Sequence, residues 1–103
     1  FNYATFADSY SSQVYTENEW NCATIVQNGS VVTFFRNAVN VTDVSSLSGT
    51  YTTNAVDLYL GIDEDETTLP FNGLLGEVYI FNVSLTTNNA VDLYNQTKSR
   101  YGL

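Results

Sequence analysis

The alternation of apolar and polar positions predicts a β-hairpin in the first half of the chain. Within residues 19–27, one face carries every second side chain: Trp20, Cys22, Thr24 and Val26. Ala23 and Ile25 fall on the other face, and this period of two is typical of a strand. Asn28-Gly29 follows, and this dipeptide between apolar runs is a strong hairpin signal. Residues 31–36 then form the returning strand, and residues 36–42 read as a tight turn with a short continuation.

Two further strands are predicted in the second half. Residues 56–62 place their apolar side chains on a single face, as in a half-buried strand: Val56, Leu58, Leu60 and Ile62. Residues 74–83 are apolar on both faces, which is typical of a strand inside a packed structure. The Ser/Thr-rich residues 43–55 read as a long surface connection before them.

The tail has the pattern of a short helix over residues 87–99. Thr86 is a candidate N-cap, and Gly102 suits a C-terminal cap. Ala90, Leu93 and Tyr94 recur at helical spacing. Weak strand candidates at residues 1–6 and 13–16 complete a mostly β chain, and the length of 103 residues predicts one domain over 1–103.

Charge and composition exclude several classes of protein. The net charge is -8 with only three cations, so no basic stripe can follow a phosphate backbone or an anionic membrane surface. No apolar run reaches the roughly 18 residues of a membrane span. Hydrophobic residues make up 44% of the chain, which argues against disorder. A folded domain that binds neither nucleic acid nor a membrane is expected.

The chain lacks the side chain that most often serves as a general base, histidine. The chain has no histidine, and the one cysteine, Cys22, therefore lacks the usual partner of a thiolate nucleophile. A single cysteine also excludes an internal disulfide framework and a thiolate metal cluster. Cys22 is expected to be a free, buried, small apolar residue. We expect no enzyme activity.

Residues 63–66 form an acidic cluster with two interpretations. Asp63 and Asp65 offer the hard oxygen ligands that Ca²⁺ prefers, from alternate positions. The other interpretation is a solvated acidic loop, since the spacing is not that of an EF-hand. Adjacent acids on one loop cannot flank a glycosidic bond from two sides, so glycoside hydrolysis is not expected. Calcium is the only cofactor that the sequence indicates.

Asn-X-Ser/Thr acceptor patterns for N-glycosylation occur at four asparagines: Asn28, Asn40, Asn82 and Asn95. They fall at the hairpin turn, at a strand end, after the buried strand and late in the helix. All are positions where a side chain can reach solvent. For Asn28, the alternative is a turn residue chosen because asparagine tolerates a positive φ. Glycosylation places the protein outside the cell, or on a cell or virion surface.

The order of these elements resembles the C-terminal half of the laminin-G-like, concanavalin A-type jelly roll. The resemblance covers roughly residues 17–95 and is most specific in its last block, where the matching positions are Phe71, Gly73, Glu77, Val78, Ile80, Phe81, Asn82, Leu85, Leu93 and Tyr94. Gly76 departs from the acidic residue common there. The resemblance implies an all-β fold, an antiparallel two-sheet β-sandwich with a short C-terminal helix.

A whole domain of that type needs about 150–200 residues, within the usual size range of domains. Half of it leaves open sheet edges and an uncovered apolar face. Either the fold is a reduced version or another copy donates the missing strand. Residues 1–12 are the candidate donated or edge strand, with four interface aromatics: Phe1, Tyr3, Phe6 and Tyr10. The alternative is that this segment pairs within its own sheet.

The other aromatics divide between core and surface. Trp20 opens a strand and is expected to anchor the core, whereas Tyr15, Tyr51 and Tyr101 lie in less regular stretches that suit exposed contacts. Two functions remain open. One is a glycosylated extracellular subunit that self-assembles into a filament or surface layer by strand completion. The alternative is a carbohydrate-binding or cell-adhesion module of a larger secreted or surface protein, with glycans as partners.

Overall fold

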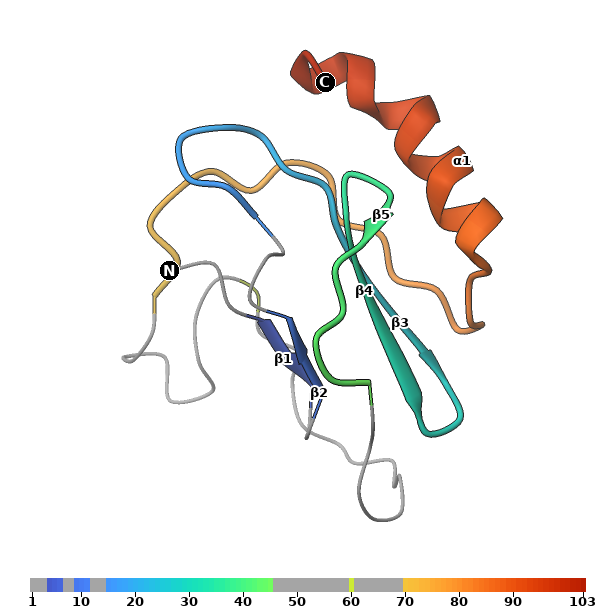
Figure 1. Ribbon diagram of the computed structural model, residues 1–103. Helices are drawn as coiled ribbons and strands as arrows, with labels where there is room; N and C mark the ends of the chain where they lie inside the picture. Colours follow the sequence, from blue (N-terminus) through green and yellow to red (C-terminus); the bar gives the residue numbers. More distant parts are fainter. Residues whose placement is uncertain (1–3, 7–8, 12–14, 46–59, 61–69) are drawn as a thin grey trace. The chain divides into compact units, whose positions relative to one another are not determined.

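A computed structural model describes residues 4–6, 9–11, 15–45, 60 and 70–103. The chain divides into two compact units, residues 1–49 with 81–103, and residues 50–80. The helices and strands of the described ranges all lie in the first unit (Figure 1). That unit is the part of the molecule on which the site is built.

The predicted hairpin forms the centre of the first unit. Strands β3 (Ala23–Asn28) and β4 (Val31–Arg36) pair antiparallel, and β5 (Val39–Asn40) adds to β4. The register pairs Asn28 with Val31, so the two turn residues are Gly29 and Ser30. Gly29 has φ +60, and only the first turn residue is left-handed, as in a type II′ turn. The predicted hairpin is confirmed. Its two turn residues lie one residue later in the chain than a turn centred on Asn28 and Gly29.

The second turn, between β4 and β5, is built from Asn37 and Ala38. Both residues have positive φ, 49° and 65°, as a type I′ turn requires. The Asn37 side-chain Oδ1 accepts a hydrogen bond from the backbone N–H of Cys22 at 2.8 Å. The backbone N–H of Asn37 donates to the Cys22 carbonyl at 2.9 Å. These two bonds attach the turn to the start of β3.

Replacing Ala38 with glycine is expected to stabilise the protein by about 0.5–1 kcal/mol. An alanine Cβ is strained in the left-handed region, and the strain relieved exceeds the extra backbone entropy that glycine loses on folding. Urea denaturation of Ala38→Gly measures the gain. The matched control, Ala23→Gly in strand β3, lacks a positive φ and is expected to lose about 0.5–1 kcal/mol. A less stable Ala38→Gly variant would contradict this account.

Each face of the sheet carries a small apolar cluster. Val32 and Phe34 are fully buried on one face, against the partly buried Tyr15 and Val41. The other face carries the second cluster: Val26, Phe35 and Ala90, with Leu85 packed against it. Because Phe34 and Phe35 are consecutive in a strand, they point to opposite faces. Strand β4 is therefore buried on both sides and is the core of the unit.

The helix is as the sequence predicts. Helix α1 (Thr87–Thr97) begins after the N-cap Thr86, whose side chain accepts from the backbone N–H of Asn89 at 3.1 Å. The Asn89 side chain accepts in return from the Thr86 N–H at 3.2 Å, which completes a capping box. A 3-10 turn, η1 (Lys98–Tyr101), follows and ends at Gly102 with φ 71. The apolar side of the helix reaches the sheet through Ala90.

The N-terminal segment forms a hairpin within the chain. Strands β1 (Ala4–Phe6) and β2 (Ser9–Ser11) pair antiparallel, in a two-stranded sheet of their own. Ser11 is buried, and its hydroxyl donates to the carbonyl of Val41. Strand β2 also contacts β4. The segment thus pairs with itself and does not join the β3–β5 sheet, and donation to another copy stays a prediction.

The expected strand over residues 74–83 is wrong for the structure. Residues 70–86 carry no strand, and every side chain from Pro70 to Ser84 is exposed. Extended backbone becomes a strand only when a neighbour takes up its hydrogen bonds. The predicted strand at residues 56–62 lies outside the described ranges apart from Leu60, and the acidic cluster with Asp63 and Asp65 lies wholly outside them.

Two aromatic predictions are also corrected. Trp20 is 37% exposed and lies before β3, because the chain turns at residues 17–19 and the strand begins only at Ala23. Its ring packs instead on Tyr101, with 4.7 Å between centroids and an interplanar angle of 49°. Tyr15, expected at the surface, is half-buried against the Val32 and Phe34 cluster. The exposure of Trp20 thus follows from the start of β3, which the alternation alone placed four residues too early.

Candidate functional site

Strand β3 is an edge strand, and its outer side is the first candidate interaction surface. The sheet order is β3-β4-β5, so among the strands of the described ranges only β4 pairs with β3, on one side. The Cys22 carbonyl points toward the β4 side, since it accepts a hydrogen bond from Asn37, which follows β4. Along an antiparallel strand the backbone N–H and C=O groups of successive residues point alternately to one side and the other. The N–H and C=O groups of Ala23, Ile25 and Gln27 therefore point away from β4.

This edge is largely open within the described part of the chain. Ser84 donates its hydroxyl hydrogen to the Gln27 carbonyl, at one end of the edge. No other described residue bonds to the outward groups of Ala23 and Ile25. The strand is six residues long and contains no charged residue and no proline. Natural edge strands commonly carry such residues to prevent pairing with other chains, so β3 lacks the usual protection.

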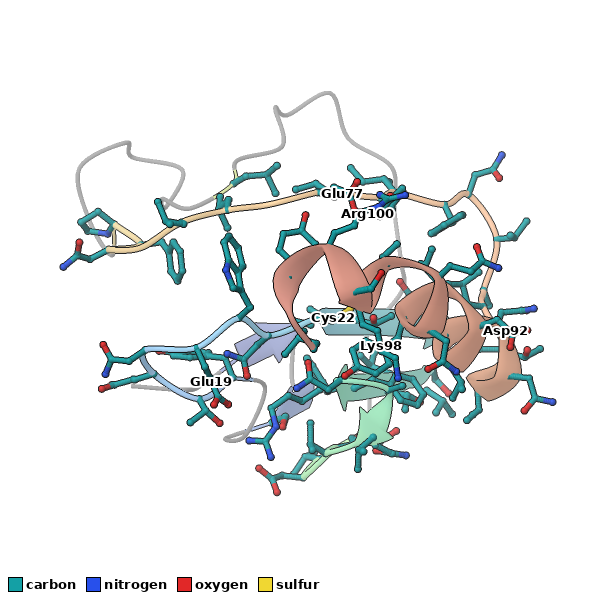
Figure 2. All side chains as sticks on the ribbon, turned by 90° about the horizontal axis from the view of Figure 1, so that it is seen from above. Glu19, Cys22, Glu77, Asp92, Lys98 and Arg100 are labelled. Carbon is teal, nitrogen blue, oxygen red and sulfur yellow. The ribbon has the colours of Figure 1, made fainter. Side chains whose placement is uncertain are left out.

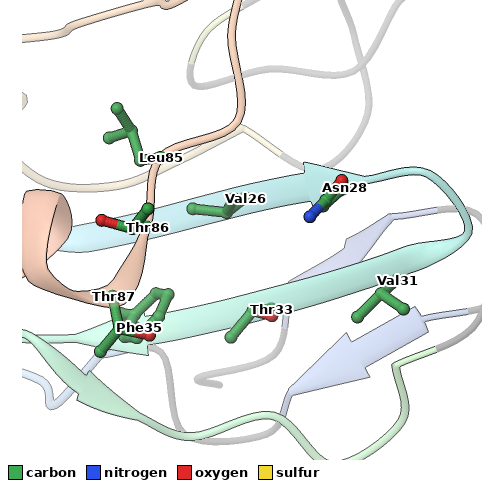
Figure 3. A pocket seen from close by; sticks show the side chains of 8 residues that line it. All are labelled: Val26, Asn28, Val31, Thr33, Phe35, Leu85, Thr86 and Thr87. Carbon is green, nitrogen blue, oxygen red and sulfur yellow. The ribbon is translucent and has the colours of Figure 1, made fainter.

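A groove lies on the face of the β3–β4 hairpin beside the segment that enters helix α1 (Figure 3). Its volume is about 300 Å³, and we call it the central groove; it is lined by Val26, Asn28, Val31, Thr33, Phe35, Leu85, Thr86 and Thr87. The floor is apolar, with Val26 and Phe35 buried, and the rim is made of amide and hydroxyl groups. No charged side chain lines it, so it suits a neutral partner.

A second groove, of about 410 Å³, lies along helix α1. It is lined by Phe81, Leu85, Asn89, Asp92, Leu93 and Gln96. The polar members come from one side of the helix, at spacings of three and four residues, and Phe81 is 48% exposed. Leu85 lines both grooves. The second groove therefore joins an exposed aromatic ring to three polar side chains.

The described charged groups are spread over several segments of the chain. No three His, Cys, Asp or Glu side chains gather within the described ranges. Glu19 and Asp92 lie far apart in Figure 2, at the turn before β3 and on α1. The ammonium group of Lys98 lies 5.4 Å from the centre of the Tyr94 ring.

Cys22 is free and half-buried, with its Sγ 4.0 Å from the Thr24 hydroxyl. No helix in the described ranges has the length and apolarity to cross a membrane.

The glycosylation asparagines are all at the surface. Asn28 ends β3, Asn40 ends β5, Asn82 lies in a bend, and Asn95 lies in α1; each is exposed. The turn interpretation of Asn28 is not supported, because the positive φ belongs to Gly29. Of the interface residues expected in the N-terminal segment, Phe1 and Tyr3 lie outside the described ranges, whereas Phe6 and Tyr10 lie in β1 and β2.

The sequence pattern predicts neither groove. The lining of the central groove comes from residues 26–35 and 85–87, which are far apart in the chain. A partial signal was present, since Val31, Thr33 and Phe35 alternate and must share one face of β4. The pattern does not predict that Leu85 covers this face of β4.

The comparisons with known proteins agree with the element order. The laminin G-like family model of the concanavalin A-like lectin/glucanases superfamily matches residues 2–90. No curated protein matches the chain. A crystal structure of an S-layer domain-containing protein from Clostridium thermocellum, residues 221–444, is similar with a TM-score of 0.63 and 20% identity. That similarity covers 82% of this chain and 43% of the other.

The chain therefore belongs to the concanavalin A-like lectin/glucanases superfamily, as its motifs predict. At 20% identity, the likeness to the Clostridium structure shows a shared fold. The chain spans less than half of that structure. Within the described ranges, the shared fold appears as a three-stranded antiparallel sheet followed by a C-terminal helix.

Proposed function

We propose that the chain is a non-enzymatic, glycosylated structural module of an extracellular surface protein, and that copies assemble by strand completion. The observation that carries this proposal is the uncharged edge of β3, at which the outward backbone groups of Ala23 and Ile25 have no partner among the described residues. An edge that leaves backbone donors and acceptors without partners pairs readily with an extended segment of another chain. Main-chain hydrogen bonds then supply the affinity.

Completion by a second copy fits the architecture of the fold. A two-sheet sandwich buries the inner faces of both sheets, so each sheet needs a second layer of strands. Strands from a neighbouring copy complete the sandwich and, when repeated head to tail, build a filament or layer. The similar Clostridium protein contains an S-layer domain, which supports a surface layer as the setting and an extracellular location.

The donated segment in this proposal is residues 1–12, which include Phe1, Tyr3, Phe6 and Tyr10. Within this segment the structure describes two antiparallel strands of three residues each, Ala4–Phe6 and Ser9–Ser11. So short a two-stranded sheet is marginally stable by itself. Release of this hairpin exposes Ser11 and breaks its hydrogen bond to Val41, and main-chain hydrogen bonds to β3 of a neighbour offset that cost.

Sedimentation velocity of the intact chain over a hundredfold range of concentration tests self-assembly. We expect species larger than the 11.4 kDa monomer, with a proportion that grows with concentration. A monomer throughout the range would overturn the proposal. We also expect that the chain hydrolyses no neutral oligosaccharide, because it has no histidine and its acidic cluster, residues 63–66, consists of adjacent residues that cannot flank a glycosidic bond.

A second candidate function is a carbohydrate-binding or adhesion module, and the second groove favours it. Phe81 presents a ring face on which the apolar side of a sugar can stack, and Asn89, Asp92 and Gln96 offer hydrogen-bonding groups for hydroxyls. The volume of about 410 Å³ lies within the roughly 300–1,000 Å³ range of small-molecule sites. Calcium at Asp63 and Asp65 remains a proposal for this candidate.

If this candidate is right, Phe81→Ala is expected to weaken binding of neutral hexose oligosaccharides at least tenfold, because the stacking surface is lost. Phe81→Trp keeps the surface and is the matched control. Isothermal titration, with and without Ca²⁺, measures both. If Phe81→Ala and the parent chain bound these oligosaccharides with equal affinity, the second groove would not be the sugar site.

A further inference from the structure

The four glycosylation motifs differ in what the folded chain does with their hydroxyl groups. N-glycosylation requires Ser or Thr two residues after the asparagine, so the transferase must recognise that hydroxyl. A hydroxyl that is already bonded in the folded protein has to be released before it can serve. The hydrogen bonds of Ser30, Thr42, Ser84 and Thr97 therefore decide which motif is usable after folding.

Three of these hydroxyls are engaged. Thr42 Oγ1 accepts from the Phe34 N–H at 2.8 Å and also lies 3.4 Å from the Phe34 carbonyl. The Ser84 hydroxyl donates to the Gln27 carbonyl on the edge of β3. Thr97 Oγ1 donates to the carbonyl of Leu93 at 2.9 Å, inside helix α1. Releasing each one breaks a contact of the sheet or the helix.

The motif at the hairpin tip is different. Asn28, Gly29 and Ser30 are all exposed, and neither the Asn28 side chain nor the Ser30 hydroxyl bonds to another described residue. The turn projects from the end of β3 and β4 (Figure 1). Both groups that a transferase must contact are thus available without any local unfolding.

We propose that Asn28 is the motif that accepts a glycan on the folded protein, whereas Asn40, Asn82 and Asn95 accept one only before folding. In the transfer, Asn28 Nδ2 forms a bond to the anomeric carbon of a lipid-pyrophosphate-linked oligosaccharide. The bond from that carbon to the pyrophosphate oxygen breaks, its electron pair leaves with the pyrophosphate, and Nδ2 gives up one proton.

The position of Asn28 gives the modification a consequence for the site. Asn28 and Val31 form the turn end of the central groove, opposite Thr86 and Thr87 (Figure 3). A glycan at Asn28 therefore stands at the mouth of this groove and beside the end of the β3 edge. It limits access to both, so this part of the inference rests on the proposed function.

The test is in-vitro glycosylation of the folded, full-length chain by a purified oligosaccharyltransferase with a lipid-linked oligosaccharide donor. Four synthetic peptides, one for each motif, give the intrinsic rate of each sequence. Mass spectrometry of the digested product measures occupancy at each asparagine. We expect the rate relative to the peptide to be at least tenfold higher at Asn28 than at Asn40, Asn82 or Asn95.

Two variants at Ser30 test whether modification of Asn28 depends on the hydroxyl group of its motif. Ser30→Ala is expected to abolish modification of Asn28 without changing the fold, and Ser30→Thr to preserve it. An unmodified Asn28 in the folded chain, or an equal relative rate at any of the other three asparagines, would overturn the inference. The reaction is measured on dilute protein and does not depend on self-assembly, so a failure of the proposed function leaves this result interpretable.

Discussion

Phe34→Ala is expected to lower the free energy of unfolding by about 3–5 kcal/mol, the usual cost of removing a large buried aromatic side chain. Phe34 is fully buried, and its neighbours Val32, Tyr15 and Val41 come from three segments of the chain. The cavity that alanine leaves cannot be closed by one loop. Since the total stability of a domain is about 5–15 kcal/mol, much of the population should unfold.

Urea denaturation followed by Trp20 fluorescence measures this loss. Trp20 reports on the fold because its ring packs on Tyr101, at the other end of the chain. Val31→Ala is the matched control on the same strand, since Val31 is 50% exposed, and it is expected to cost less than about 1 kcal/mol. If Phe34→Ala lost no more than this control, the cluster around Phe34 would not be the core of the unit.

Ile25→Lys is expected to weaken self-association at least tenfold, or about 1.4 kcal/mol. Ile25 lies in the middle of the open part of the β3 edge and is 47% exposed. A lysine on an edge strand is a common natural device against strand addition, because pairing would desolvate or crowd its charge. The stability of the folded monomer should change much less, since the side chain is half in solvent already.

Two controls separate charge at the edge from other effects. Ile25→Thr keeps a β-branched residue without charge and should assemble as the parent chain does. Ser99→Lys adds the same charge at an exposed position of η1, away from the strand. Sedimentation velocity of the four proteins at one salt concentration compares them. Equal loss in Ile25→Lys and Ser99→Lys would mean that net charge, not the β3 edge, controls association.

The parts of the fold that local sequence determines were predictable. The alternation around Cys22, Thr24 and Val26 gave the two faces of β3 correctly, since Ala23 and Ile25 are exposed on the other side. Thr86 and Gly102 cap the helical tail as expected, because capping depends on residues within one turn. The family was recognisable from the spacing of its last motifs.

The parts that depend on distant partners were not predictable. Residues 74–83 have the pattern of a buried strand, yet they carry no strand in the structure, because strand formation requires a neighbour that the pattern does not specify. Trp20 shares the alternation of β3 but precedes its first paired residue. Both grooves contain Leu85, whose position against the sheet is a tertiary contact.

The most direct test of strand completion is negative-stain electron microscopy of the intact chain beside a chain that lacks residues 1–12. The account predicts regular filaments or layers for the intact chain and dispersed particles for the shortened one. Circular dichroism of the shortened chain, with the β3–β4 sheet and helix α1 retained, serves as the control for folding. Dispersed particles in both samples, or regular assemblies in both, would contradict donation of the N-terminal strand.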